Sequence, residues 1–259
     1  MSYKTITYEE RDKVGILCLN RPRKRNALSR GLLEEFTSCI KDAGRRGSVR
    51  VIIIRGEGEH FCAGHDLVEI LEEDQVGIRG LFEACIRLMN LLQQIPQPVI
   101  AQVRGVATAA GCQLVAASDL AVAEEGALFA TPGVKIGLFC STPMVPLSRA
   151  VGRKRALEML FTGRFVSARE ALDFGLINRL VPLEKLEEET WKLARDIARY
   201  SLATLGLGKR GFYRQWDMAE GQAYEFAKEL IAANALMEDA KEGISAFLEK
   251  RKPRWKDGE

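Results

Sequence analysis

The chain has 259 residues, of which 47% are hydrophobic and 28% charged, and its formal net charge at pH 7 is +3. This length suffices for one large domain that buries its own core without disulfides or a metal. The small net charge gives no support for nucleic-acid binding. The sequence contains no run of 18 apolar residues, so we expect no membrane span. The amino-terminal stretch MSYKTITYEERDK lacks an apolar signal region and is too acidic for a transit peptide, so we expect a cytoplasmic protein.

Cysteine and histidine usage bears on metal and redox chemistry. The six cysteines include no C-x-x-C pair, and most lie in apolar stretches, where a free cysteine packs as a small hydrophobic side chain. His60 and His65 are the two histidines. So few potential ligands predict that the chain has no metal site.

The first half of the chain alternates predicted strands and helices. Apolar residues at helical spacing predict a helix capped by Ser29 and another over Leu81–Leu92. Short apolar runs that end at turn residues predict strands. These runs are Val14–Leu19, Val51–Ile54, Val99–Val103, Leu120–Ala123 and Leu128–Ala130.

From Pro143 onward the pattern predicts helices only. A capping box begins at Ser167, and Gly175 marks the end of the helix that it opens. Two long helical stretches follow, Leu183–Tyr200 and Ala219–Lys250. The sequence therefore predicts an α/β core followed by an all-helical region.

Two segments rich in small residues, His60–Leu67 and Gly105–Leu114, each follow a predicted strand and can open a helix. The first N–H groups of a helix have no partner inside it, and two that converge could stabilise the oxyanion of a thioester enolate. Taken alone, such turns more often serve packing, because glycine first solves a backbone problem. The segments by themselves leave both interpretations open.

Four segments in this order resemble the crotonase superfamily, the family of the enoyl-CoA hydratases and isomerases. They are Asn26-Ala27-Leu28, Phe61 to Leu67, Gly105 to Asp119 and Glu242 to Arg251, and they span nearly the whole chain. The combination of Gly64-His65-Asp66-Leu67 with Gly137 to Pro143 is similar to one subgroup, the enoyl-CoA hydratase domain-containing protein 3 type.

The resemblance implies a crotonase (ClpP-like) α/β fold. A spiral of ββα units would occupy residues 1–195, and a C-terminal helical trimerisation region would occupy residues 196–259. The implied substrate is an acyl-CoA thioester, in which coenzyme A belongs to the substrate and no separate cofactor is needed. The implied assembly is a homo-oligomer, a trimer or a dimer of trimers, with no nucleic acid or membrane partner.

The resemblance also assigns site residues. The backbone N–H groups of His65 and Ala110 would form an oxyanion hole. Phe247 and Lys250 would reach the coenzyme A of a neighbouring subunit. The remaining substrate contacts would be Arg23, Lys24, Ala27, Ala63, His65, Asp66, Leu67 and Gly111. The cations at positions 23–25 suit a phosphate-rich ligand, although a solvated basic loop has the same composition.

The chain departs from the family where a hydratase carries its two glutamates, since those positions hold Gln113 and Gly133. A third position, an aspartate in some relatives, falls at Ser141. An amide cannot exchange a proton at neutral pH, and each lost acid or base costs about 10²–10⁴-fold in rate. We therefore predict that hydration of crotonyl-CoA is absent or very weak. Glutamate at positions 113 and 133 should restore some activity if the pocket geometry is kept.

Two functions remain open at this point. One is an enzyme that stabilises a thioester enolate, with the His65 imidazole as a possible acid or base, and with Cys140 as a nucleophile only if its thiolate is stabilised. The other is a non-catalytic acyl-CoA binder or scaffold that has kept the pocket. Asp119 is interpreted as an anchor for the adjoining turn.

Overall fold

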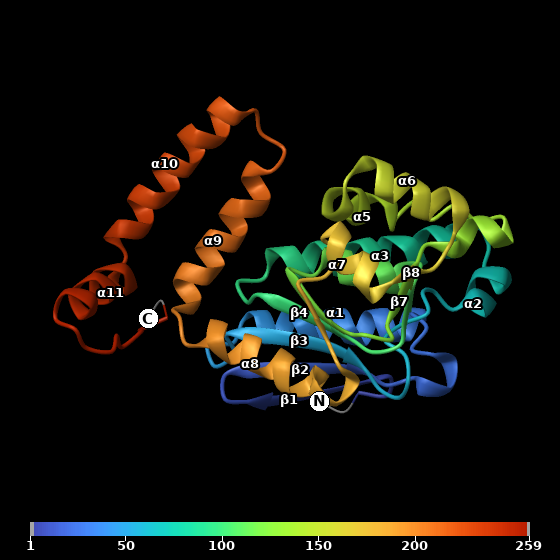
Figure 1. The fold of residues 1–259 in the computed structure, drawn as a ribbon, viewed down its shortest axis with the longest axis horizontal. Helices are drawn as coiled ribbons and strands as arrows, with labels where there is room; N and C mark the ends of the chain where they lie inside the picture. Colours follow the sequence, from blue (N-terminus) through green and yellow to red (C-terminus); the bar gives the residue numbers. More distant parts are fainter. Residues whose placement is uncertain (1–2, 258–259) are drawn as a thin grey trace.

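The computed structural model describes residues 3–257 as two β-sheets with surrounding helices and a C-terminal helical extension (Figure 1). In the six-stranded sheet, β1 is antiparallel to β2 and all other neighbours are parallel. Its strands, in spatial order, are β1 (Ile6–Arg11), β2 (Val14–Leu19), β3 (Val51–Gly56), β4 (Val99–Val103), β6 (Leu120–Glu124) and β9 (Arg179–Val181). The smaller sheet orders β5 (Val106–Thr108), β7 (Leu128–Ala130) and β8 (Val166–Ser167).

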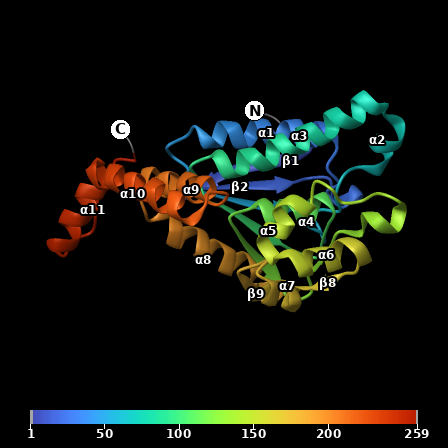
Figure 2. The same ribbon diagram turned by 90° about the horizontal axis from the view of Figure 1, so that it is seen from above.

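Different helices bury the two faces of the large sheet, because side chains alternate along each strand. Leu17 and Ile52 belong to the core formed with α1, α3 and α4. Ile16 and Ile53 belong to a second core formed with α8. Figure 2 shows α1 and α3 on one side of the sheet and α8 on the other. These helices are α1 (Arg30–Gly44), α3 (Gln75–Gln94), α4 (Ala110–Ala117) and α8 (Leu186–Ala198).

The remaining helices flank the sheets or extend away from them. In Figure 1, α9, α10 and α11 project beyond the sheet, and α9 packs against α3 of the core. No helix within residues 3–257 combines the length and apolar content needed to cross a membrane. The bounds are α2 (Leu67–Glu72), α5 (Met144–Val151), α6 (Arg153–Thr162), α7 (Ala168–Phe174), α9 (Leu202–Gln215), α10 (Glu220–Leu236) and α11 (Glu238–Leu248).

The predicted strands and helix caps of the core are confirmed. All five predicted strands are present, and Ser29 caps α1 by accepting a hydrogen bond from the Leu32 N–H group. The capping box is complete, since Ser167 and Glu170 each accept a hydrogen bond from the other's backbone N–H group. Gly175 ends α7 with a φ of 84°, a conformation that favours glycine.

The prediction that only helices follow Pro143 is wrong. β8 is a strand of the smaller sheet, and β9 is a strand of the large sheet. They are two and three residues long, too short for a periodic pattern to show in the sequence. β1 lies outside the predicted strands because most of its side chains are exposed. The stretch 219–250 is also not one helix, since Met237, with a ψ of 149°, separates α10 from α11.

The predicted division into regions 1–195 and 196–259 stays a prediction. Position 195 falls inside α8, whose side chains pack on the large sheet as far as Ala198. Residues 1, 2, 258 and 259 of the two regions lie outside the described residues.

Candidate active site

A largely apolar cavity of about 740 Å³ lies beyond the carboxyl ends of β2, β3, β5 and β7. Many of the predicted site residues line it: Lys24, Ala27, Ala63, His65, Asp66, Leu67, Ala110, Gly133, Cys140 and Ser141. Other predicted site residues, Arg23, Gly111, Gln113, Phe247 and Lys250, are not part of this lining. The fold thus brings together segments that are more than one hundred residues apart in the sequence.

Backbone pairing holds the two glycine-containing turns side by side. The Thr108 N–H group donates to the Cys62 carbonyl oxygen at 2.9 Å. A Cβ atom on Gly64 would lie 2.8 Å from the Ala109 Cβ atom, and one on Gly111 would overlap the Cys62 carbonyl oxygen. Glycine is required at both positions because the two turns approach so closely.

His65 and Ala110 each present a backbone N–H group without an acceptor. Neither group donates a hydrogen bond to any atom of residues 3–257. Ala110 opens α4, where an N–H group has no partner inside the helix. Ala109 before it adopts φ 49° and ψ −117°, and such a conformation costs a non-glycine residue about 1–3 kcal/mol. The packed turns hold this backbone in place.

The His65 side chain forms part of the cavity wall. Its ring meets the Phe82 ring edge-on, with the centroids 5.0 Å apart, and its Nε2 atom has no hydrogen-bond partner within the described chain. Burial lowers the pKa of His65 to about 4, because the imidazolium form loses its hydration. The imidazole is therefore neutral near pH 7.

The carboxylate on the cavity wall belongs to Asp66, and both of its oxygens bind groups of the protein. Asp66 forms an ion pair with Arg21 at 2.9 Å, and its other oxygen accepts the Val68 N–H group at the start of α2. Arg21 also donates to the Ala27 carbonyl oxygen at 2.6 Å. Asp66 is the one acidic residue that lines the cavity within residues 3–257. This carboxylate holds the loop and α2 together.

Neither position of the missing glutamate pair offers an acid or a base. Gln113 is 3% exposed, and its Oε1 atom has no partner in the described structure. A Cβ atom on Gly133 would overlap the Leu138 carbonyl oxygen and lie 2.9 Å from the Cys140 Sγ atom. The Leu138 N–H group donates to the Gly133 carbonyl oxygen at 3.0 Å, which folds the chain back over position 133. A glutamate there cannot keep the pocket geometry, so the condition for restoring hydration is not met.

Cys140 and Ser141 border the same cavity. Burial raises the pKa of the Cys140 thiol, although a backbone hydrogen bond involving Gly133 partly opposes this. The thiol therefore stays protonated near pH 7, which disfavours Cys140 as a nucleophile. The Ser141 hydroxyl donates to the Phe139 carbonyl oxygen at 3.3 Å.

Asn26 keeps the basic loop beside the cavity. Its side chain accepts a hydrogen bond from the Arg21 N–H group and donates to the carbonyl oxygens of Glu57 and His60. The loop it supports includes the short 3₁₀ helix at Pro22–Lys24, from which Lys24 reaches the cavity lining.

Several lining residues were not among the predicted site residues. The sequence does not single out Phe82, because this residue lies next to the buried face of α3 that contains Leu81 and Cys85. Leu138 and Phe139 are about half exposed, and neighbouring exposed apolar residues beside glycine and proline are a signal that could have found them. The unpredicted lining comprises Val68, Ile70, Phe82, Ala109, Pro132, Lys135, Ile136, Leu138, Phe139, Thr142 and Pro143.

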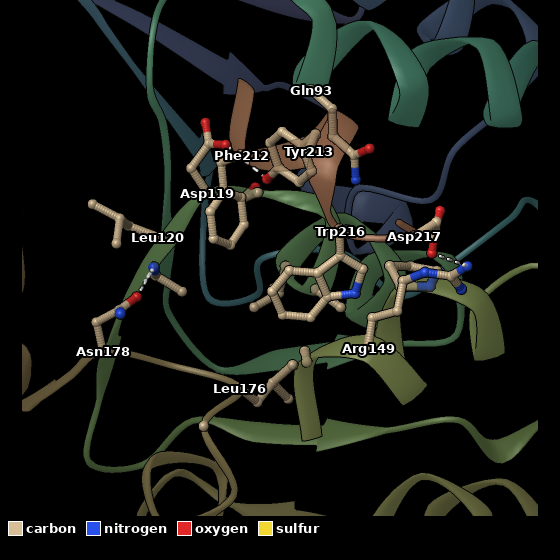
Figure 3. A pocket seen from close by; sticks show the side chains of 17 residues that line it. Gln93, Asp119, Leu120, Arg149, Leu176, Asn178, Phe212, Tyr213, Trp216 and Asp217 are labelled. Carbon is tan, nitrogen blue, oxygen red and sulfur yellow. Dashed lines mark hydrogen bonds and ion pairs between the residues drawn. The ribbon is translucent and has the colours of Figure 1, made fainter. Parts of the chain in front are cut away.

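A smaller cavity of about 320 Å³ lies between the end of α9 and the core (Figure 3). Beside it, the Asp119 carboxylate accepts hydrogen bonds from the Val99 N–H group at 2.7 Å and the Tyr213 hydroxyl at 2.8 Å. Lys209 of α9 forms an ion pair with Asp119 at 2.6 Å. These contacts support the interpretation of Asp119 as an anchor, and no predicted substrate contact lines this cavity.

Residues 9–258 match the family model described as enoyl-CoA hydratase/isomerase. The chain belongs to this family, and its α/β architecture with a C-terminal helical region is the crotonase fold. Both the resemblance and the fold class expected from the sequence are confirmed.

Individual relatives refine this placement. The chain is 48% identical to human enoyl-CoA hydratase domain-containing protein 3, mitochondrial, over 94% of this chain and 81% of the relative. The crystal structure of human enoyl coenzyme A hydratase domain-containing protein 3 superposes with a TM-score of 0.95 at 46% identity, covering 97% of this chain and 100% of that one. An enoyl-CoA hydratase structure from Mycobacterium smegmatis gives a TM-score of 0.95 at 44% identity, over 97% and 99% of the two chains. The subgroup expected from the motifs is therefore confirmed.

Proposed function

We propose that this protein binds acyl-CoA thioesters in the cavity at His65 and Ala110 and stabilises the thioester enolate. The observation that carries the proposal is a largely apolar cavity of about 740 Å³ bordered by two residues whose backbone N–H groups have no acceptor within residues 3–257. A thioester oxygen gains negative charge as its α-carbon loses a proton. A preorganised donor at such an oxygen contributes about 2.7–4 kcal/mol to the transition state.

The side chains of the cavity favour proton transfer within the substrate, as in isomerisation, over hydration. Asp66 is ion-paired with Arg21, so it is not free to activate water. The Nε2 atom of the neutral His65 ring has no partner in the described chain and can accept a hydrogen bond, but the pKa of about 4 makes the ring only a weak base. Coenzyme A takes part as a portion of the substrate, and this chemistry needs no further cofactor.

A second candidate is a non-catalytic acyl-CoA binder. Two observations favour it: position 133 has no room for a side chain, and the one carboxylate on the described cavity wall is engaged in an ion pair. The two candidates share the binding step and differ in whether the enolate is stabilised.

The coenzyme A end of the site is proposed to involve two subunits. Phe247 is 82% exposed, and neither it nor Lys250 lines the cavity of its own chain. Both lie at the end of the helical extension, from which they could reach a neighbouring subunit in a trimer or a dimer of trimers. Lys24 and Lys135, at the cavity of the same chain, supply positive charge for phosphates.

The cytoplasmic location expected from the sequence remains a prediction. The human relative named above carries the word mitochondrial in its name, so it gives this prediction no support.

Acetoacetyl-CoA separates the two candidates in one titration. Its enolate absorbs in the near ultraviolet, so an oxyanion hole should increase the enolate fraction of the bound ligand. We expect micromolar binding by calorimetry together with that absorbance change. Binding without the change would leave the non-catalytic binder, and undetectable binding of acetyl-, butyryl- and acetoacetyl-CoA would contradict both candidates.

Crotonyl-CoA tests the loss of hydration directly. With no free carboxylate at positions 113, 133 or 141, we expect the enoyl absorbance to persist in the presence of the enzyme, or to decay several orders of magnitude more slowly than with a two-glutamate relative. That relative is the control in the same assay. Turnover at about 10 per second or more, a rate ordinary for enzymes, would show that another acid or base acts here.

A further inference from the structure

A separate recess of about 710 Å³ opens at the amino ends of β2 and β3. Lys13 immediately precedes β2 and Arg50 immediately precedes β3, whereas the acyl cavity lies beyond the carboxyl ends of these strands. A strand rises about 3.3 Å per residue, so the six residues of β2 separate the two ends by roughly 17–20 Å. No residue lines both the recess and the acyl cavity.

The recess is strongly basic. Its charged lining consists of Lys13, Arg50, Arg195, Arg199 and Arg254 against the single carboxylate of Asp12. We call this set the basic recess. Within residues 3–257, Arg50 is the one cation of the set that has an ion-pair partner, and this partner is Asp257. The Asp12 carboxylate lies 3.8 Å from Arg11, which does not belong to the set. Like charges around one hollow repel one another, and a bound anion would relieve that repulsion.

The acidic side chain beside Arg254, Glu242, is bonded mainly to another arginine. Glu242 accepts hydrogen bonds from Arg251 through both carboxylate oxygens and from the Arg254 N–H group. The hydrogen bonds from Arg251 are the main reason that the pKa of Glu242 falls to about 2, with the Arg254 charge adding to it. Glu242 does not line the basic recess. Because Glu242 is shared with Arg251, it offsets only part of the positive charge that Arg254 brings to the recess.

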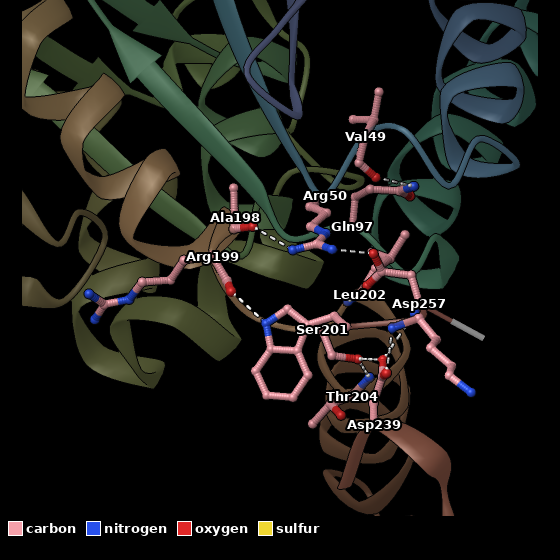
Figure 4. A network of polar contacts seen from close by, with 12 residues as sticks. Val49, Arg50, Gln97, Ala198, Arg199, Ser201, Leu202, Thr204, Asp239 and Asp257 are labelled. Carbon is pink, nitrogen blue, oxygen red and sulfur yellow. Dashed lines mark hydrogen bonds and ion pairs between the residues drawn. The ribbon is translucent and has the colours of Figure 1, made fainter. Parts of the chain in front are cut away.

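Arg50 gives the recess a fixed base (Figure 4). It is 4% exposed, and its guanidinium donates to the Ala198 carbonyl oxygen at 3.1 Å and to the Asp257 carboxylate. Asp257 also accepts the Leu202 N–H group at 2.8 Å. The Nε atom of Arg50 is buried without a partner in the described structure. Because Asp257 already balances its charge, Arg50 holds the floor of the recess in place, and the exposed cations around it supply the charge for an anion.

An aromatic ring forms one wall of the recess. Trp255 lines it, and its Nε1 group donates to the Arg199 carbonyl oxygen at 2.7 Å. The Arg199 guanidinium lies 4.9 Å from the centroid of the Tyr200 ring and donates to the Tyr200 hydroxyl, so it is also held by a neighbour. A flat ring beside fixed cations suits a ligand that joins phosphates to a planar group.

A purely structural explanation covers only part of this cluster. Arg195 and Arg199 belong to the last turn of α8 and its C-cap, where cations stabilise the exposed carbonyl groups. Arg50 in turn is bonded to Asp257 and Ala198. Neither effect explains why Lys13 and Arg254, from two other segments and without an ion-pair partner within residues 3–257, line the same hollow. We propose that the basic recess binds a phosphorylated small molecule through a di- or polyphosphate group, at a site separate from the acyl cavity.

Pyrophosphate tests this proposal by calorimetry with the full chain in low-salt buffer. We expect saturable binding with a stoichiometry of one per chain, weakened at least tenfold in the double variant Arg195→Glu, Arg254→Glu. Both side chains are exposed, and an unchanged melting temperature will show that the variant is folded. Arg87→Glu, an exposed arginine on α3, makes the same kind of change away from the recess and should leave the affinity unchanged.

A fluorescence titration locates the site. Pyrophosphate and ADP should each change the tryptophan emission of the wild-type protein, and Trp255→Phe should remove that change. Butyryl-CoA carries an ADP group of its own, so the competitor is S-butyryl-pantetheine, which lacks the phosphates and should not displace pyrophosphate. Displacement would show that the recess is part of the acyl site and would overturn the proposal. Absence of pyrophosphate binding, or full affinity in the double variant, would overturn it too.

Discussion

At position 133, the path of the backbone leaves no space for the glutamate that a hydratase carries. The Leu138 carbonyl oxygen and the Cys140 Sγ atom occupy the space that a side chain at Gly133 would enter. A substitution there forces the turn at 132–138 to move, and such overpacking typically costs about 1–3 kcal/mol. The absence of an acid at this site is therefore built into the local fold.

We expect Gly133→Ala to lower the free energy of unfolding by about 2 kcal/mol, because even one methyl group overlaps the Leu138 carbonyl oxygen. Urea denaturation measures it. Gly208→Ala is the matched control, since a Cβ atom there meets nothing within 4 Å inside α9 and should stabilise the helix by about 0.5–1 kcal/mol. Equal effects of the two substitutions would show that position 133 has room for a side chain.

His65 links the acyl cavity to pH-dependent stability. Its pKa is about 4 in the folded protein against 6.5 for the free side chain, so between these values the unfolded chain binds the extra proton. The stabilising contribution of the neutral ring is fully present above pH 6.5 and is lost as the pH falls toward 4. The shift corresponds to roughly 3 kcal/mol at most.

Comparison of the wild type with His65→Gln isolates this contribution. Between pH 7 and pH 4 we expect the wild type to lose up to about 3 kcal/mol more stability than the variant, because glutamine does not titrate. Urea denaturation at a series of pH values provides the measurement. Parallel stability curves for the two proteins would mean that His65 is not buried in its neutral form.

At the scale of elements, α9 is held to the core by a buried ion pair. The Lys209 Nζ atom lies 2.6 Å from Asp119 and also donates to the carbonyl oxygens of Leu92 and Gln97. These contacts connect α9 to the end of α3 and to the segment just before β4. They therefore set the direction in which α10 and α11 leave the core.

Lys209→Met should lower the free energy of unfolding by about 3 kcal/mol, because it leaves the largely buried Asp119 carboxylate without its counter-ion. Lys228→Met removes an exposed ion pair with Glu225 on α10 and should cost less than about 1 kcal/mol. Thermal denaturation of both variants gives the comparison. Similar losses would argue that the Lys209 pair does not anchor α9.

At the scale of the whole molecule, the helical extension exposes more apolar surface than a free monomer needs. α10 has no buried residue within the described chain, and Tyr224, Ile231, Leu236 and Leu248 are each more than half exposed. Large exposed apolar patches mark sites of association. This surface supports the predicted trimer or dimer of trimers.

Light scattering at micromolar concentration should therefore give the mass of a trimer or hexamer. Leu236→Asp, at a side chain 72% exposed on α10, should shift the mass toward the monomer, because it places a charge in an apolar interface. Leu71→Asp, at a side chain 86% exposed on α2, is the same change away from the extension and should leave the mass unaltered. A stable wild-type monomer would contradict the predicted assembly.

The sequence by itself determined the elements whose signals are local. The strands of the core, the caps at Ser29 and Ser167 and the end of α7 at Gly175 follow from periodicity and from side chains that bond to nearby backbone. The family also followed from the sequence, because its motifs recur in a fixed order along the chain.

Tertiary structure alone decided the features that depend on distant contacts. The strands β8 and β9 are stable only because a neighbouring sheet edge accepts their hydrogen bonds. The exclusion of a side chain at Gly133 comes from the chain returning at Leu138. The pairing of Asp66 with Arg21 joins residues that are 45 positions apart. Such effects arise from which atoms meet in space, and no local pattern of residues records them.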